Sequence, residues 1–405
     1  MNNIKVFVHD SFDELSGMQQ DWDEFIESID GEIFLTYDWC RVWWKYYGHK
    51  RKLIIFTFRY QEHLCGILPL FLENIWFGPV FVRVIKMIGS DFLPVALSAP
   101  IKKEFLNEVV HCFINELANK YSFDSLHIGP ICGRYESFDI LEKSFSEVIK
   151  GTHTIKLKIS DVQTYFKVAD TWDKQLINLS HNEKRNMNKH YDRILRKGIP
   201  IECTGATNEN IEIIFDNFVK MHQSHWGEKG QAGHFVAWPD SVQFHREMSH
   251  VQLQRKRLRL YSINVNGHCI GYHYAYKFGN TYYLFLYSRT AGNAEKGEKY
   301  DFGRIDFAET IKQAIKEQVK LCDAMRGKYD YKLQLGGELL PIRNIYIYSN
   351  KMIAKCRIIA ARVLATVIDI CYNKIWRVRI APHIGVKLGA FWRIWLRTNI
   401  FSYYK

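Results

Sequence analysis

The sequence predicts a mixed α/β (α+β) fold with two domains in tandem, each a mostly antiparallel central sheet flanked by helices, followed by a basic helical tail. Segments whose apolar residues recur at helical spacing alternate with short runs rich in Val, Ile, Tyr and Phe. The order of two helices, three strands, a helix and a strand occurs twice along the chain. The predicted domains are residues 1–159 and 160–350, and the tail is 351–405.

The elements of the first domain follow from this periodicity. The N-terminus resembles a first strand and has no apolar core of a signal peptide, so secretion is not expected. Apolar spacing predicts helices at 12–29, 36–47, 102–120 and 137–145, and strands at 52–58, 63–72, 81–87, 125–128 and 152–159.

The second domain repeats the order with clearer turn signals. Asn266-Gly267 joins two strand-like runs and supplies the two positive-φ positions of a two-residue hairpin turn. Capping patterns and apolar spacing predict one helix that begins at residue 170 and further helices at 180–197, 208–226, 241–254 and 303–316. Strands are predicted at 258–265, 268–278, 281–288, 319–323 and 344–348.

Charge and cysteine content limit the classes of function. The nine cysteines occur singly, which indicates reduced thiols in a cytosolic protein. The net charge is +12, but residues 351–405 hold eleven Lys and Arg against one Asp, so the body is nearly neutral. The tail is also rich in Trp, Phe and Tyr and has no uncharged apolar run long enough to span a bilayer. It is predicted either to lie on an anionic membrane surface or to pack as helices on the second domain, with nucleic-acid binding as a third interpretation.

The start of the helix at 303–316 is the candidate phosphate site. Acyl transfer from a thioester requires a cradle for the cofactor phosphates, and a helix N-terminus offers free N–H groups and a positive dipole end. Lys299, Tyr300, Gly303 and Arg304 are therefore candidate cofactor-binding residues. Asp301 suits a helix N-cap better than a phosphate contact, and Gly303 is also explained as a turn residue.

The neighbouring strands supply candidate catalytic groups. His273, in the middle of the second strand, is either a general base or a hydrogen-bonded histidine in an aromatic sheet. Tyr287 and Ser288 end the third strand, where either hydroxyl can reprotonate a leaving thiolate. Asp323 ends the next strand and is a further catalytic candidate.

Further residues are candidates for substrate binding. Arg326 and Lys332 follow the strand that holds Asp323 and either line a cleft or belong to a solvated loop. His222, Trp226 and His234 belong to a histidine-rich stretch that we assign to a substrate-side helix and loop. No cysteine or carboxylate set completes a zinc motif there, so no metal is expected.

Over roughly residues 10–345, the chain carries a series of motifs that resemble those of a known family. The motifs that carry the resemblance are Phe34–Trp39, Trp43-Trp44, Gly66–Leu70, Ile88–Asp91, Leu179–Arg185 through Gly198, His222–Phe235, Tyr300–Gly303 and Asp323–Lys332. Together they resemble the bacterial GNAT-type acetyltransferase-like proteins labelled cellulose-biosynthesis CelD-like, which are related to the Fem-type aminoacyltransferases.

The resemblance implies two tandem GNAT-like domains. The second would keep the cofactor-type loop, and the first, which lacks a basic glycine loop after its third strand, would serve as scaffold or acceptor surface. The expected donor is acetyl-CoA or another acyl-CoA, and the expected acceptor is an amine or hydroxyl of a small molecule or a lipid-linked sugar in cell-envelope or exopolysaccharide biosynthesis. The expected location is cytoplasmic, at the inner face of the membrane.

Two other functions stay open from the sequence. One is aminoacyl transfer from tRNA, because closely spaced glycines of the acetyl-CoA loop are missing. The other is a non-catalytic scaffold of a polysaccharide synthesis complex.

Overall fold

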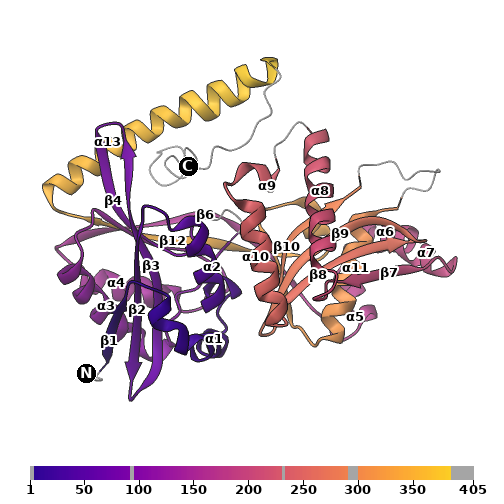
Figure 1. Cartoon of the computed structure of the whole chain (residues 1–405), viewed down its shortest axis with the longest axis horizontal. Helices are drawn as coiled ribbons and strands as arrows, with labels where there is room; N and C mark the ends of the chain where they lie inside the picture. Colours follow the sequence, from indigo (N-terminus) through magenta and orange to yellow (C-terminus); the bar gives the residue numbers. More distant parts are fainter. Residues whose placement is uncertain (1–3, 92–94, 230–232, 291–299, 385–405) are drawn as a thin grey trace. The chain divides into compact units, whose positions relative to one another are not determined.

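The computed structural model describes residues 4–91, 95–229, 233–290 and 300–384, which form two compact units (Figure 1). Within these residues, unit 1 comprises 4–162 and 341–384, and unit 2 comprises 163–340. Each unit holds a mostly antiparallel sheet flanked by helices, so the predicted fold class is confirmed.

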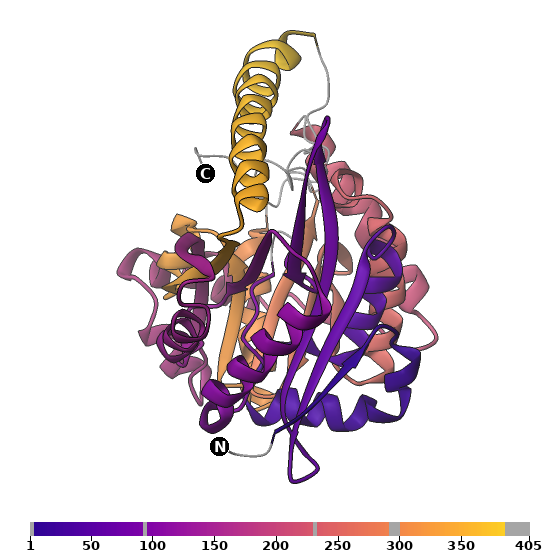
Figure 2. The same ribbon diagram turned by 90° about the vertical axis from the view of Figure 1, so that its left-hand side faces the viewer.

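The sheet of unit 1 has the strand order β1-β2-β3-β4-β5-β12. Only β4 and β5 pair in parallel among these neighbours. The strands are β1 (Lys5–His9), β2 (Lys52–Tyr60), β3 (His63–Phe77), β4 (Val80–Met87), β5 (Ser125–Ile131) and β12 (Glu338–Ser349). The β3–β4 hairpin can be followed in purple in Figure 2.

The helices of unit 1 are amphipathic and bury aromatic side chains, among them Trp22, Trp39 and Trp43, all at most 1% exposed. They are α1 (Gln19–Ser28), α2 (Tyr37–Tyr47), α3 (Leu106–Lys120) and α4 (Phe138–Val148), with 3₁₀ turns at Asp13–Met18, Ile33–Leu35 and Lys103–Phe105.

Helix α13 (Met352–Ile368) belongs to unit 1 and continues as a π-helical segment, Asp369–Ile380, and a 3₁₀ turn, Ala381–Ile384. Ile358, Ala361 and Ala365 pack against apolar residues of β3 and β4. The sequence left open whether the tail packs on the second domain, whereas its described helix packs on unit 1. Among the described residues, no helix is both long and apolar enough to cross a membrane.

The sheet of unit 2 has the order β6-β11-β10-β9-β8-β7, in which β10 and β11 are parallel and the other neighbours antiparallel. The strands are β6 (His153–Lys167), β7 (Ile201–Gly205), β8 (Leu258–Val265), β9 (His268–Phe278), β10 (Thr281–Arg289) and β11 (Leu321–Arg326). Asn266 and Gly267 both have positive φ, so the predicted hairpin turn is confirmed.

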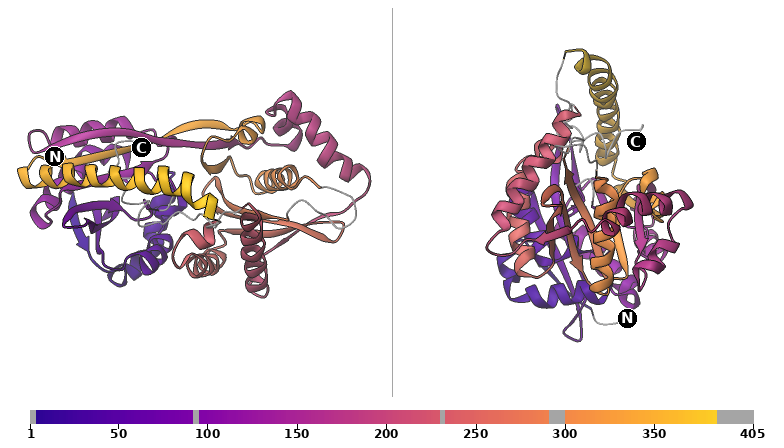
Figure 3. Two further views of the ribbon diagram at one scale, coloured as in Figure 1. Left: turned by 90° about the horizontal axis from the view of Figure 1, so that it is seen from above. Right: turned by 90° about the vertical axis from the view of Figure 1, so that its right-hand side faces the viewer.

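Helices cover both faces of this sheet. They are α5 (Trp172–Ile177), α6 (His181–Met187), α7 (Arg193–Arg196), α8 (Ile211–Glu228), α9 (His234–Ala237), α10 (Ser241–Gln254), α11 (Phe302–Lys316) and α12 (Asp330–Gln334). A π-helical segment, Asn188–Asp192, joins α6 to α7, so the charged helix predicted at 180–197 is present in three pieces. Figure 3 shows α8 and α11 on opposite sides of β8, β9 and β10.

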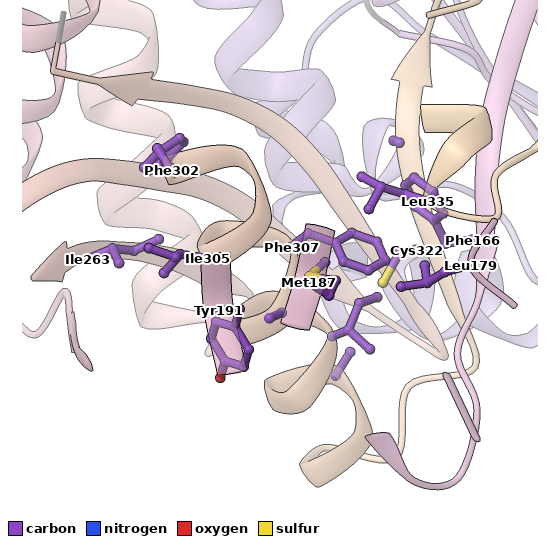
Figure 4. Packing of buried hydrophobic residues seen from close by; sticks show 14 of the residues in the cluster. Phe166, Leu179, Met187, Tyr191, Ile263, Phe302, Ile305, Phe307, Cys322 and Leu335 are labelled. Atoms are coloured by element: carbon purple, nitrogen blue, oxygen red, sulfur yellow. The ribbon is translucent and has the colours of Figure 1, made fainter. Parts of the chain in front are cut away.

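The core of unit 2 lies between α11 and the sheet. Ile305, Phe307 and Ile311 of α11 pack with Ile263 of β8 and Cys322 of β11. In Figure 4, Ile305 lies beside Ile263, and Phe307 lies beside Met187. This packing fixes α11 against the strands that carry the candidate site residues.

The unit boundaries differ from the predicted ones. The chain enters unit 2 within β6 and returns to unit 1 within β12. Residues 341–349 therefore belong to unit 1, where β12 pairs with β5 from Arg343–Ile131 to Tyr348–Ser125. A prediction based on periodicity assigns a strand to its sequence neighbours, but hydrogen bonding assigns this one to a strand two hundred residues earlier.

A candidate acyl-transfer site

Parallel strands β10 and β11 stay paired over only three positions, Thr281–Leu321, Tyr282–Cys322 and Tyr283–Asp323. Beyond Tyr283 and Asp323, β10 continues beside β9 and β11 continues beside β6, and each ladder has a register shift at this point. We call the two arms, residues 284–289 and 324–326, the fork. Their facing edges are not paired with each other, and the 284–289 arm is the one that leaves backbone groups for a ligand, because the carbonyls of the 324–326 arm accept from Lys332.

Lys332 of α12 lies against the β11 arm of the fork. Its Nζ donates to the carbonyl of Ala324 at 2.7 Å and, at 3.4 Å, to the carbonyls of Met325 and Arg326. The residue is 5% exposed, and its ammonium lies over the Tyr329 ring. A positive charge is thus held at the end of a strand, in a site with little water.

His273 of β9 lies on the face of the sheet that α11 covers. Its Nδ1 is 2.8 Å from Oδ1 of Asp306, and its ring stacks on Tyr261 at 5.0 Å between centroids. Both ring nitrogens are buried and neither makes a hydrogen bond among the described residues, so the short distance to Asp306 is the contact of Nδ1. A histidine with a carboxylate close to one nitrogen and no partner at the other can accept a proton from a bound group.

Tyrosines link this histidine to the fork. Tyr287 of β10 lies directly opposite His273, and its hydroxyl lies near that of Tyr331 in α12. Partial desolvation of the hydroxyl, with a contribution from Asp306, raises the pKa of Tyr287, so it stays protonated and can donate. Tyr287 is 46% exposed, so it is accessible to a substrate.

Ser288 and Asp323, the other two candidate catalytic residues, lie on the opposite face. Ser288 pairs with Tyr272, whose ring contacts Phe218 of α8, and its buried Oγ has no partner among the described residues. Asp323 accepts hydrogen bonds from the Gln163 amide and the Met325 backbone, which fix the bend in β11. The structure therefore brings His273 and Tyr287 together and separates both from Ser288 and Asp323.

The N-terminus of α11 differs from the phosphate cradle predicted for it. Asp301 is the N-cap, as predicted, and its carboxylate accepts from the Arg304 backbone. The Arg304 guanidinium is bonded to Glu183 and to Asp301. Two carboxylates thus neutralise the cation and occupy the helix end, which disfavours an anion at Gly303 and Arg304. Tyr300 packs partly buried against the core, and Lys299 lies outside the described residues.

The histidine-rich stretch is buried on the α8 side of the sheet. Nε2 of His222 accepts from Nε1 of Trp226, and Nε2 of His234 lies 2.8 Å from Nε2 of His245. Burial lowers the pKa of His222 to about 4 and that of His234 to about 3, so both are neutral at pH 7. Their rings pack with Phe235, which is a core role rather than the predicted substrate contact.

The remaining assignments concern Arg326 and metal binding. Arg326, opposite Gln163, ends the β11 arm of the fork. Among the described residues, no group of three or more His, Cys, Asp or Glu side chains is arranged to hold a metal ion.

The sequence analysis did not predict three residues of the site. Asp306 and Tyr261 were not singled out because their partner His273 is distant in the chain, and Tyr331 was passed over beside Lys332. Asp306 does leave one signal, as an acid placed between two core positions of α11, Ile305 and Phe307.

Comparisons with known proteins concern the fold. Residues 182–333 match the acetyltransferase (GNAT) domain family. The fold of this part of unit 2 is that of a GNAT domain. The structure of FemX superposes with a TM-score of 0.58 at 9% identity, over 87% of this chain and 99% of FemX.

Two weaker likenesses were found among solved structures. A tandem GNAT protein from the clavulanic acid pathway gives a TM-score of 0.40 at 10% identity, over 86% of this chain and 98% of the other. L-PGS from Bacillus licheniformis gives 0.47 at 8% identity, over 85% and 96%. No curated protein matches the chain.

Proposed function

We propose that the chain is an acyltransferase that moves an acyl group, in the first instance acetyl, from acyl-CoA to an amine or hydroxyl. The fork, with the Lys332 ammonium at its β11 arm, is the observation that carries the proposal. The pantetheine arm of CoA is an extended chain with two amides, and an extended ligand can pair with the open edge of the 284–289 arm as an added strand does. This would place the thioester beside Lys332.

The chemistry then needs two groups of this chain. The acceptor nitrogen or oxygen attacks the thioester carbonyl, and its proton passes to Nε2 of His273, whose Nδ1 faces Asp306. The Lys332 ammonium stabilises the negative oxygen, competing with its two long carbonyl contacts. The C–S bond breaks, the acyl group stays on the acceptor, and the thiolate takes a proton from the Tyr287 hydroxyl.

A transfer assay with labelled acetyl-CoA tests the proposal. Wild-type protein should label amino-sugar or lipid-linked sugar acceptors, and Lys332→Met should lower kcat about 100-fold or more, as loss of one oxyanion donor does. Lys328→Met is the matched control, because Lys328 is exposed in the loop before α12. No labelling of any acceptor by wild type, or equal loss in both variants, would count against the proposal.

The acceptor class is part of the proposal and is supported by the resemblance to CelD-like proteins. We infer an amine or hydroxyl of an envelope polysaccharide precursor, modified at the cytoplasmic face of the membrane. The likeness in fold to FemX favours one alternative, aminoacyl transfer from tRNA. Charged tRNA should therefore replace acetyl-CoA in a parallel reaction. If Lys332→Met and His273→Gln proteins both support function in cells, the chain is a scaffold instead.

Helix α13 supports the membrane location. Its outer face exposes Met352, Ile359, Val363 and Val367 at helical spacing, next to the exposed cation Lys355. An apolar stripe with adjacent cations suits the boundary of an anionic bilayer. Figure 1 shows this helix in yellow.

Vesicle sedimentation tests the membrane proposal. The protein should bind phosphatidylglycerol vesicles more strongly than phosphatidylcholine vesicles. Ile359→Ser with Val363→Ser should weaken binding about tenfold or more, because two apolar side chains no longer enter the bilayer. Ile177→Ser with Ile213→Ser, at exposed positions of unit 2, is the control. Equal binding by both double variants would contradict a role for α13.

A further inference from the structure

The β3–β4 hairpin of unit 1 extends beyond the rest of its sheet. β2 pairs with β3 no farther toward the hairpin turn than Leu72, and β5 pairs with β4 no farther than Val84. Among the described residues, 73–77 and 80–83 therefore pair only with each other. Figure 1 and Figure 2 both show this outer part of the hairpin beside α13, at the same end of unit 1.

The tip of this hairpin carries no polar side chain. Residues 75–82 are Ile-Trp-Phe-Gly-Pro-Val-Phe-Val, and the turn itself, Gly78-Pro79, is exposed. Three other two-residue hairpin turns of the chain each carry at least one polar side chain: Gln61-Glu62, Asn266-Gly267 and Gly279-Asn280. Polar residues are usual where a turn faces water. The composition of residues 75–82 instead favours contact with an apolar phase.

The two faces of the hairpin differ in what covers them. Ile75 and Phe77 of β3 form one apolar cluster with Ile358 of α13. Trp76 lies on the opposite face, because side chains alternate along a strand, and it is 49% exposed. Its ring packs on Phe81 of β4 at 4.8 Å between centroids. The hairpin thus holds the indole in place and leaves about half of it uncovered.

Cations lie behind this aromatic tip. Arg83 is two residues beyond Phe81 on the same face of β4, about 7 Å farther from the turn. The Arg357 guanidinium of α13 lies over the Phe81 ring, 4.5 Å from its centroid. Both cations contact Asp124, at 3.6 Å and 3.5 Å, and this carboxylate is buried. One acid for two cations leaves a net positive charge beside the tip.

The order of these groups along the hairpin matches the layers of an anionic bilayer. Trp side chains concentrate at the boundary between headgroups and acyl chains, and Arg side chains interact with the lipid phosphates outside it. Here the aromatic pair lies nearer the turn, and the cations lie farther from it. A second protein would account for the exposed indole, but it would not require cations behind it.

We propose that the tip of the β3–β4 hairpin enters the boundary of an anionic bilayer, with Trp76 between headgroups and acyl chains and with Arg83 and Arg357 at the level of the phosphates. This rests on the proposed membrane location and adds a second contact beside α13. It does not depend on the acyl-transfer reaction.

Vesicle sedimentation with the full chain tests the contact. Trp76→Ser should weaken binding to phosphatidylglycerol vesicles about fivefold or more, because the indole no longer enters the bilayer. Phe7→Ser, on β1 of the same unit, is the matched control, since Phe7 is an aromatic residue with 43% exposure. It should change binding less than about twofold. Both variants should melt close to wild type, because both side chains are exposed.

Fluorescence quenching gives a second measurement of insertion. Phosphatidylglycerol brominated on its acyl chains quenches an indole that reaches those chains. Such vesicles should therefore quench the tryptophan fluorescence of wild type more than that of Trp76→Phe, which keeps an aromatic ring but lacks the indole. Equal quenching of the two proteins would contradict insertion of Trp76.

Four outcomes of the binding experiments would overturn the proposal: no vesicle binding by wild type, unchanged binding by Trp76→Ser, equal weakening by Trp76→Ser and Phe7→Ser, or a dimer without lipid that Trp76→Ser makes monomeric. Ile359→Ser with Val363→Ser separates the hairpin from α13, because weakening by that variant alone would support α13 and exclude the hairpin. Trp76-dependent vesicle binding by a protein that transfers no acyl group would contradict the acyltransferase function and support the hairpin contact.

Discussion

His273 lies in the middle of a buried strand, between Tyr261 and Tyr287 on the strands to either side. Both ring nitrogens are buried without a hydrogen bond among the described residues, and Nδ1 lies 2.8 Å from Oδ1 of Asp306. A buried polar atom that lacks a hydrogen bond lowers stability, so such atoms are few and are frequently functional. At the residue scale, this makes His273 a stronger candidate than Ser288, whose buried hydroxyl has no carboxylate-held histidine beside it.

We predict that His273→Gln lowers kcat by about 100-fold or more, the usual contribution of a positioned base. The melting temperature should change little, because the amide keeps a polar group between the tyrosines. Asp306→Asn should lower kcat less and alter the pH dependence of kcat, since it acts through the histidine. Steady-state kinetics over a pH series, with melting curves for each variant, provide the measurement. A His273→Gln protein with wild-type kcat would exclude His273 as the base.

At the scale of helices and strands, some features of the structure could be predicted from the sequence and others could not. Local signals gave the Asn266-Gly267 hairpin and the Asp301 cap, because both depend on adjacent residues. The same signals predicted a free Arg304, yet its partner Glu183 is 121 residues away. The sequence analysis assigned His222 and His234 to a substrate-side helix and loop, whereas here both are neutral and packed.

These histidines on the α8 side of the sheet make the free energy of unfolding depend on pH. Burial lowers the pKa of His222 from 6.5 to about 4, so below pH 6.5 the unfolded chain binds a proton that the folded chain does not. The free energy of unfolding is therefore highest above pH 6.5 and falls toward pH 4, by about 1.4 kcal/mol per pH unit for each such histidine.

Urea unfolding at pH 7 and pH 5 tests this for one residue. His222→Gln keeps an acceptor for Trp226 and removes the titrating ring, so the variant should lose less stability between the two pH values than wild type does. His63→Gln, at an exposed strand end, is the control and should behave as wild type does. An unchanged pH dependence in His222→Gln would contradict the burial argument.

The whole molecule is organised around strands that carry the chain from one unit to the other. Unit 1 is complete only when the chain has returned through β12, which pairs with β5, and α13, which covers Ile75, Phe77, Val82 and Val84. By sequence, residues 351–405 were a tail that follows the domains. By packing, their first helix is part of the core of the unit that begins at the N-terminus.

Two shortened chains distinguish these descriptions. A chain ending at residue 350 keeps β12 but uncovers the apolar cluster on β3 and β4, so we expect a lower melting temperature and aggregation. A chain ending at residue 384 keeps α13 and should melt close to the full chain. Loss of α13 removes several buried apolar side chains from contact, each worth about 1.5–3 kcal/mol, which is large against the total stability of a domain. Differential scanning calorimetry compares the three proteins, and an equal melting temperature for the chains ending at 350 and 384 would show that α13 is not part of the unit 1 core.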